Sequence, residues 1–244
     1  MFLFAQKEDS KETQRLKAIK DYRYQHEMSG GLKIQTNGVS LYLTKGWIKN
    51  IYKTHLVQAE YQFHINYKDK LVKPNALYDG KKYYYGLQHQ FHAIRFSYGF
   101  ERCIADKAEV NGVRLSFIGF AGFSLGLLKP YYLEIYKGRD ANGDPIHESV
   151  GYSEGNDSKF MNQDSIYGAS PFYKGMNKMI PTFGGHLKLG LNFDWGSKDL
   201  WVKAIQAGIM ADVYYRKVAI YVNKDANNFF MPALYLSFHF GKRW

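Results

Sequence analysis

Cysteine is almost absent from this sequence of 244 residues, which contains only Cys103. A single cysteine excludes an intramolecular disulfide framework and any metal site built from several thiolates. Long apolar segments are also absent, because no stretch without Asp, Glu, Lys or Arg exceeds 16 residues, and the one from Leu115 to Leu128 has 14. A membrane-spanning helix needs about 18–20. The sequence therefore excludes a helical inner-membrane protein but leaves open a transmembrane β-barrel, whose strands need roughly 9–11 residues each.

Acidic residues are scarce relative to basic ones, with 22 Asp and Glu against 33 Lys and Arg and a formal net charge of +11. This excess predicts acidic partners, such as nucleic acid or the phosphates of phospholipids and lipopolysaccharide. Familiar chemical motifs are missing: there is no P-loop and no GxGxxG, and the Gly-x-Ser-x-Gly string at 122–126 lacks the strand-to-helix turn of a nucleophile elbow. The histidines His64, His89 and His92 do not have a spacing typical of a zinc site. We therefore predict no cofactor and no metal.

Apolar and polar residues alternate along much of the chain, which is rich in Tyr and Phe. For example, Tyr61, Phe63 and Ile65 alternate with Glu60 and His64. A period of two places the two sets on opposite faces of a β-strand. The alternating segments reach roughly 10–16 residues, whereas strands of soluble proteins typically have about 5–6. This length favours tilted strands that cross a hydrocarbon layer, with the apolar face toward lipid and the polar face enclosed.

The sequence thus predicts an all-β fold, a closed antiparallel up-and-down transmembrane β-barrel of eight strands. Asn37-Gly38 is a candidate hairpin turn that would split the first strand and raise the count to ten. The connections near Ser124–Lys129 and Ser197–Leu200 are expected to be short turns, and Lys68–His89 is too long for that side. The predicted strands are residues 30–44, 50–67, 90–103, 111–124, 130–137, 184–196, 201–217 and 230–244.

Three regions are predicted along the chain. Residues 1–6 are similar to the end of a secretory signal peptide, and the charged residues 7–28 indicate a periplasmic N-terminal arm. Residues 29–244 form the barrel, with a large mobile extracellular loop at about 138–183 that is rich in Gly, Asn, Asp and Ser. An even number of strands places both the N- and C-termini in the periplasm.

The last segment alternates in register with its final aromatic residue. This pattern resembles the C-terminal β-signal of Gram-negative outer-membrane barrels, which the barrel-assembly machinery reads. Lys242 departs from it, since an apolar residue is usual there. Gly31–Lys45, Ser124–Ile135 and the final segment also resemble a family of small Bacteroidota-type outer-membrane barrels, which implies the bacterial outer membrane as location and no catalytic residues. The residues that match the assembly signal are Leu236, Phe238, Phe240 and Trp244.

Charged residues of the polar faces are expected to point into the barrel, where buried charges must pair. Glu101 and Arg114 lie on strands joined by a short link, so we expect them close together. The predicted interior ion network comprises Glu60, Arg95, Glu101, Arg114, Asp194 and Asp212. Further residues expected inside are His64, Glu134, Lys188 and His239.

The favoured function is a non-enzymatic integral outer-membrane barrel, serving as a structural or accessory subunit of a larger outer-membrane complex for assembly, secretion or transport. Its partners would be outer-membrane lipids, lipopolysaccharide, the barrel-assembly machinery during biogenesis and other outer-membrane proteins. Alternatives are a lipid-modifying acyl hydrolase or transferase using Ser237, His239 and Asp212, and a small porin.

A soluble protein that binds nucleic acid is disfavoured. The basic, Tyr-rich segment 81–85 is better interpreted as part of an aromatic girdle at the membrane interface than as a base-stacking surface. Trp47, Trp195, Trp201 and Trp244 lie near predicted strand ends, where girdle residues are expected.

Overall fold

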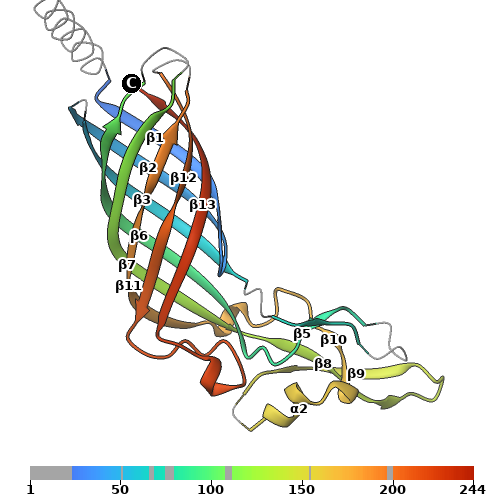
Figure 1. Cartoon of the computed structure of the whole chain (residues 1–244). Helices are drawn as coiled ribbons and strands as arrows, with labels where there is room; N and C mark the ends of the chain where they lie inside the picture. Colours follow the sequence, from blue (N-terminus) through green and yellow to red (C-terminus); the bar gives the residue numbers. More distant parts are fainter. Residues whose placement is uncertain are drawn as a thin grey trace, which may run out of the picture.

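Eight long antiparallel strands form a closed barrel in the computed structural model (Figure 1). The structure describes residues 24–50, 52–65, 69–74, 80–107, 112–153, 155–196 and 200–244. Around the barrel the strands follow the order β1-β13-β12-β11-β7-β6-β3-β2, so the predicted fold and the count of eight are confirmed. The barrel strands are β1 (His26–Gln35), β2 (Gly38–Asn50), β3 (Lys53–His64), β6 (His89–Ala105), β7 (Arg114–Pro130), β11 (Ile180–Asp194), β12 (Trp201–Tyr214) and β13 (Phe230–Arg243).

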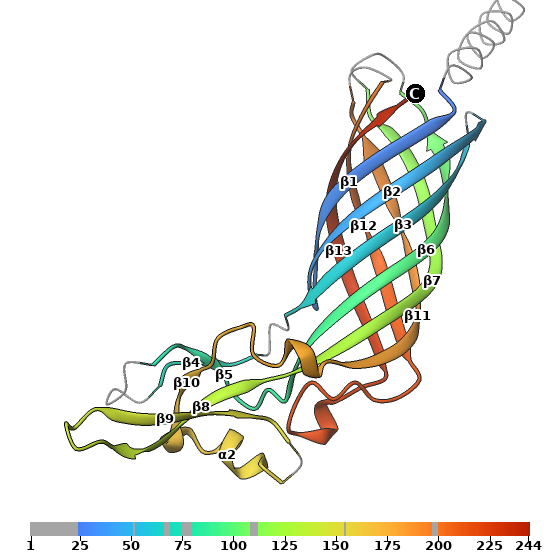
Figure 2. The ribbon, with the colours of Figure 1, turned by 180° about the vertical axis from the view of Figure 1, so that it is seen from behind.

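The two ends of the barrel differ in their connections. The C-terminus lies at the end where short connections join β2 to β3, β6 to β7 and β11 to β12 (Figure 2). The start of β1 is at this end too, because the His26 amide donates to the Trp244 carbonyl over 2.9 Å. We call this the terminal end. The long connections all emerge at the opposite end, which we call the loop end.

The first predicted strand, 30–44, is wrong because a hairpin divides it. Gln35 pairs with Gly38, so Thr36 and Asn37 form a two-residue turn, as the Asn-Gly pair indicated. Gly38 has a φ of +145°, and a Cβ there would lie 2.2 Å from the Phe63 carbonyl oxygen. The count does not rise to ten, because the predicted strand 130–137 lies outside the barrel as β8 (Tyr132–Arg139).

Several predicted boundaries also need correction. Residues 124–129 are not a turn but the last part of β7, and the link from 68 to 89 belongs to the loop end, where its length is no exception. Residues 180–183 belong to β11 rather than to the long loop. His26–Met28, assigned to the N-terminal arm, are part of β1. The predicted signal segment 1–6 and arm residues 7–23 lie outside the described residues.

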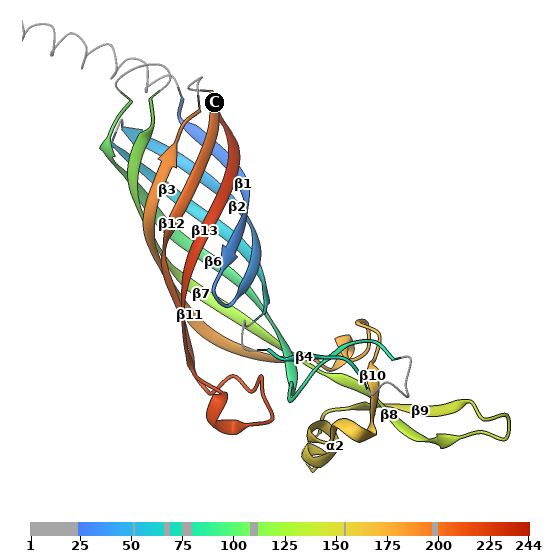
Figure 3. The ribbon, with the colours of Figure 1, turned by 45° about the vertical axis from the view of Figure 1, so that its right-hand side comes forward.

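The long loop is folded rather than a mobile connection. Together with residues 69–74 and 80–88, the described residues of this loop build a second structured unit, which we call the loop subdomain (Figure 3). Phe160 and Ile166 are fully buried there, with Leu133 beside them, and Tyr131 and Tyr83 join this core to the barrel residue Phe91. Its elements are β4 (Leu71–Val72), β5 (Tyr83–Tyr84), β8, β9 (Pro145–Gly151), α2 (Asp157–Met161), η1 (Gln163–Ser165), β10 (Ile166–Ala169) and η2 (Met176–Lys178).

Two small sheets organise the loop subdomain. One has the order β10-β8-β9 and the other pairs β4 with β5. The Ala169 amide donates to the Lys81 carbonyl over 3.1 Å and ties the sheets together. The Tyr131 hydroxyl accepts a 3.0 Å bond from the Tyr84 amide, and burial raises the pKa of this tyrosine to about 12. The subdomain therefore has a buried core that is continuous with the loop end of the barrel, and polar contacts of its own.

The barrel is apolar outside and polar inside. Leu187 and Leu234 are each 61% exposed on the outer wall, whereas Lys33, Arg95 and Lys188 are at most 1% exposed. Alternation fixes this, since a one-residue shift of register would exchange the two faces. Within the described residues, no helix is long and apolar enough to cross a membrane.

Candidate functional site

The centre of the barrel interior is organised around Arg95 on β6. Its Nη1 donates to Glu60 Oε1 over 2.6 Å, while Nε and Nη2 donate to the Asp212 carboxylate over 2.9 and 2.5 Å. Nη2 also donates to Gln62, and Lys33 donates to the other oxygen of Glu60. The structure thus brings together three residues of the predicted network, and Lys33 joins them. A guanidinium between two carboxylates offsets the high cost of burying each charge.

This central network crosses the lumen. Lys33 comes from β1, Glu60 from β3, Arg95 from β6 and Asp212 from β12, and His186 Nδ1 on β11 lies 3.0 Å from Asp212. Five of the eight strands are therefore bridged by side chains.

Lys188 adds a further bridge across the lumen. Its Nζ donates to Gln58 over 2.6 Å and lies 4.1 Å from the Phe120 ring centroid. Tyr42 and Tyr235 lie close to the same ammonium group, 5.6 Å away at their centroids. Side chains of this size fill the space that an eight-stranded barrel encloses.

A second charged cluster lies at the terminal end and contains the other three predicted residues. Arg243 donates to Glu27 over 2.8 Å and to Asp194 over 3.1 Å. Arg114 sits opposite Asp194 in the β7–β11 register and interacts electrostatically with Glu101. The six predicted residues therefore belong to two clusters. Arg243 and Glu27 were missed, although Glu27 falls on the inward-facing parity of β1.

The remaining residues expected inside divide into two groups. His64, Lys188 and His239 point inward and are buried. Glu134 was placed wrongly, because it lies on β8 in the loop subdomain, 3.6 Å from His147. The alternation of β8 matches that of the barrel strands, so the sequence signal alone did not distinguish them.

The structure does not assemble the candidate catalytic residues. The Tyr42 hydroxyl donates to Ser237 Oγ over 3.2 Å, and His239 Nδ1 has no hydrogen-bond partner. Asp212 is bound to Arg95 and His186 instead. A nucleophile, a base and an orienting acid must be linked by hydrogen bonds, and these three are not.

The three histidines weighed as a zinc site do not converge. His64 is buried on the inner face, His89 Nδ1 lies 2.8 Å from the Ala219 carbonyl at the loop end, and His92 lies on the outer face, 2.8 Å from the Tyr61 hydroxyl. Among the described residues no cluster of three or more His, Cys, Asp or Glu side chains has metal-binding geometry.

Aromatic residues surround the outer wall at both ends. All four tryptophans lie at the terminal end. There, Lys45 Nζ lies 5.5 Å from the Trp47 ring centroid, and Lys242 Nζ lies 6.0 Å from the Trp201 ring centroid. The loop end exposes Phe183, Tyr215, Phe229 and Phe230. Lys81 and Lys82 lie on the β4–β5 hairpin instead, and Tyr83 is buried, so the segment 81–85 is not part of a barrel girdle.

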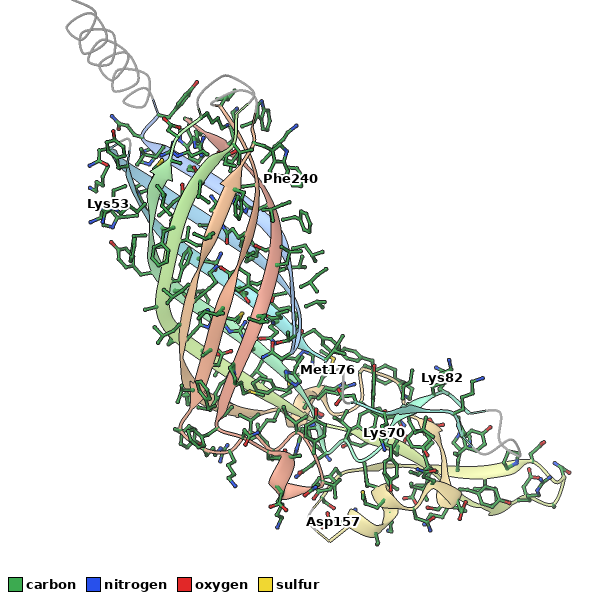
Figure 4. The ribbon with its side chains drawn as sticks, viewed as in Figure 1. Lys53, Lys70, Lys82, Asp157, Met176 and Phe240 are labelled. Carbon is green, nitrogen blue, oxygen red and sulfur yellow. The ribbon has the colours of Figure 1, made fainter. Side chains whose placement is uncertain are left out.

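The residues that match the assembly signal share the outer face of the barrel. Leu236, Phe238, Phe240 and Trp244 are between 39% and 63% exposed, and Figure 4 shows Phe240 pointing away from the lumen. Lys242 is exposed as well.

A closed antiparallel barrel with an apolar wall, two aromatic bands and a charged, filled interior is the architecture of a transmembrane β-barrel. No family model matches the chain, and no curated protein does.

Solved structures with a similar fold include Neisserial surface protein A, at 8% identity over 90% of this chain and 96% of that chain, with a TM-score of 0.42. Ail, the attachment invasion locus protein of Yersinia pestis, has 9% identity over 90% and 97%, with a TM-score of 0.40. The N-terminal β-barrel domain of Pseudomonas aeruginosa OprF has 7% identity over 90% and 96%, with a TM-score of 0.37. At this distance the likeness supports no statement about what this chain binds.

Proposed function

We propose that this protein is a non-enzymatic integral barrel of the bacterial outer membrane that carries the loop subdomain as its working part, as an accessory subunit of a larger outer-membrane complex. One observation carries the proposal: the lumen is closed by a buried ion network, while a folded subdomain, whose buried core is continuous with the loop end of the barrel, stands beyond the barrel strands. We expect a barrel with a filled lumen to act through the structures at its ends.

The outer wall supports a membrane location. β12 has 14 residues, from Trp201 to Tyr214, and connects the band at Trp201 with the band at Tyr215, which follows the strand. At about 3.3 Å per residue and a tilt of roughly 40°, it rises about 33 Å along the barrel axis, enough to cross the apolar layer. The terminal end would face the periplasm, and the loop subdomain would face the cell exterior. In this arrangement the outward face of β13 carries the residues that the assembly machinery would read.

The closed lumen argues against a porin. A conducting pore needs a continuous water-filled path, and the contacts of Arg95 with Glu60 and Asp212 join β3, β6 and β12 across the lumen. The acyl hydrolase or transferase is disfavoured because Ser237 has Tyr42 rather than a histidine as its partner. Both alternatives remain testable in the same preparation.

The experiment begins with the full chain expressed in a Gram-negative host. Membrane fractionation and a gel run with and without heating test insertion, because intact barrels migrate differently before they are unfolded. A photoreactive amino acid at Asp157, on α2 of the loop subdomain, then tests for a protein partner. The same amino acid at Leu187, on the barrel wall, is the control.

We expect a heat-modifiable outer-membrane band, a discrete protein adduct from position 157 and none from position 187. Recovery in the soluble fraction would refute the membrane location. A heat-modifiable barrel without an adduct at position 157 would refute the accessory role but keep the membrane location. Steady conductance across a planar bilayer would favour the porin.

A further inference from the structure

One face of the loop subdomain is strongly basic. It is formed by residues 69–74 and 80–85, which include the β4–β5 hairpin, and by residues 170–179; we call it the basic face. These segments contain six lysines and one acidic residue, Asp69, whose carboxylate accepts a 2.7 Å bond from the Tyr221 hydroxyl. Five of the lysines are exposed, and Lys174 is partly buried and donates to Ser149 on β9 over 2.6 Å. The exposed ones are Lys70, Lys73, Lys81, Lys82 and Lys178.

Exposed apolar side chains accompany the lysines. Phe172, Tyr173 and Met176 are 55%, 69% and 52% exposed. They follow one another on a short segment that leads directly into β11, whose Phe183 is 63% exposed on the barrel wall. The apolar surface of the barrel therefore continues onto the basic face.

The segment is fixed to the outside of the barrel. Lys129, near the end of β7, donates to the Phe172 carbonyl over 2.6 Å and lies 3.7 Å from the centroid of its ring. The His92 ring on β6 is 6.3 Å from the same phenylalanine. These contacts hold Tyr173 and Met176 at the loop end of the wall, at the level where the hydrocarbon layer would meet the headgroups.

The opposite side of the subdomain has a different charge. Residues 134–153 and 155–165, which include the β8–β9 hairpin and α2, contain six acidic residues and three Lys or Arg. In Figure 4, Lys70, Lys82 and Met176 lie on the side of the subdomain nearer the barrel strands, and Asp157 lies on the far side. Figures 1 and 3 show the same separation of the β4–β5 hairpin from α2.

We propose that the basic face lies on the outer leaflet of the membrane and binds the phosphate groups of anionic lipids, with Phe172, Tyr173 and Met176 entering the headgroup boundary. This inference rests on the membrane location proposed above. Each lysine near anionic headgroups raises the affinity of a protein surface for the membrane roughly fivefold, and adjacent apolar residues raise it further. The acidic side with α2 then remains turned away from lipid, available to a protein partner.

The test compares two kinds of vesicle that hold the refolded full chain. One is made of phosphatidylcholine alone, and in the other part of that lipid is replaced by phosphatidylglycerol. Hydrogen exchange of residues 69–74, 80–85 and 170–179 is followed by mass spectrometry. We expect exchange at least about tenfold slower in the anionic vesicles, and most of that difference lost when 0.5 M salt screens the charges.

Two variants locate the effect. The variant K70Q/K73Q/K81Q/K82Q should exchange at the same rate in both lipids, and the control K137Q/R139Q/K159Q, which removes the basic residues of the opposite side, should behave as the parent chain. Equal exchange of the parent chain in both lipids would overturn the proposal, as would a control variant that loses the lipid dependence to the same extent as the fourfold variant.

Insertion is measured in the same samples by the gel with and without heating. A heat-modifiable barrel with lipid-independent exchange overturns the basic-face proposal alone. Failure to insert in either lipid overturns the membrane location and this proposal with it. The salt dependence of the parent chain decides the question even where the fourfold variant does not fold.

Discussion

Replacing Arg95 tests whether the interior ion network holds the barrel together. The substitution Arg95→Met keeps much of the side-chain volume but removes the guanidinium that contacts Glu60, Gln62 and Asp212. Asp212 then retains His186 as a hydrogen-bond partner, and Glu60 retains Lys33. Removing one partner of a buried ion pair costs about 3–5 kcal/mol, because the other charge stays buried and uncompensated.

The matched control is an ion pair outside the barrel. Lys137 Nζ lies 3.1 Å from Glu148, and the two side chains are 51% and 61% exposed. Glu148→Gln should change the free energy of unfolding by no more than about 0.5 kcal/mol, since exposed pairs are screened by water and salt. The assay is urea unfolding of the full chain from lipid vesicles, followed by tryptophan fluorescence and by gel mobility.

A double variant separates the cost of the orphaned charge from that of lost packing. Arg95→Met combined with Asp212→Asn removes the uncompensated carboxylate, so the double variant should be about 2 kcal/mol more stable than Arg95→Met alone. The reasoning is refuted if Arg95→Met costs no more than Glu148→Gln, or if the second substitution destabilises the protein further.

Three more outcomes follow from the packing. Gly122→Ala should destabilise the barrel by about 3 kcal/mol, because its Cβ would lie 2.1 Å from the Phe96 carbonyl oxygen, whereas Gly185→Ala, with nothing nearer than 3.9 Å, should match the parent chain in urea unfolding. Tyr131→Phe should lower the free energy of opening the loop subdomain by about 1 kcal/mol, since the Tyr84 amide loses its acceptor. Hydrogen exchange should then become faster in the subdomain, while the barrel strands stay protected. The raised pKa of Tyr131 means that the folded subdomain holds the hydroxyl proton more tightly than the unfolded chain does. The contribution of Tyr131 to stability is therefore complete below pH 10.0 and is lost as the pH rises to about 12. Near-ultraviolet circular dichroism should show that loss, and a pH transition in Tyr131→Phe that matched the parent chain would contradict the prediction.

The alternation of the sequence predicted the barrel well because it reports directly on which side chains share a face. Glu60, Arg95 and Asp212 were all placed inward by parity alone, and the antiparallel register then brings Glu60 opposite Arg95. Contact between Arg95 and Asp212 requires β6 and β12 to face each other across a closed barrel. That distance in sequence, 117 residues, is invisible to a local pattern.

The errors share a physical cause. β8 alternates like a barrel strand because Leu133 and Ile135 pack into the core of the loop subdomain, and alternation does not say what covers the apolar face. Asn37-Gly38 was a candidate turn, but residues 30–44 were predicted as one strand because alternation continues on both sides of that pair. The length of a pattern therefore predicted the class of fold better than it predicted the ends of the strands.

The loop subdomain also explains why the composition alone was ambiguous. A net charge of +11 fits a nucleic-acid surface as well as a lipid surface when it is treated as a single number. The structure divides the charge: Lys33, Arg95 and Lys188 are buried among carboxylates and aromatic rings, where no partner reaches them. The five exposed lysines of the basic face are a separate group beside exposed apolar side chains. This combination suits a headgroup boundary because it offers hydrocarbon to lipid chains and charge to phosphates together.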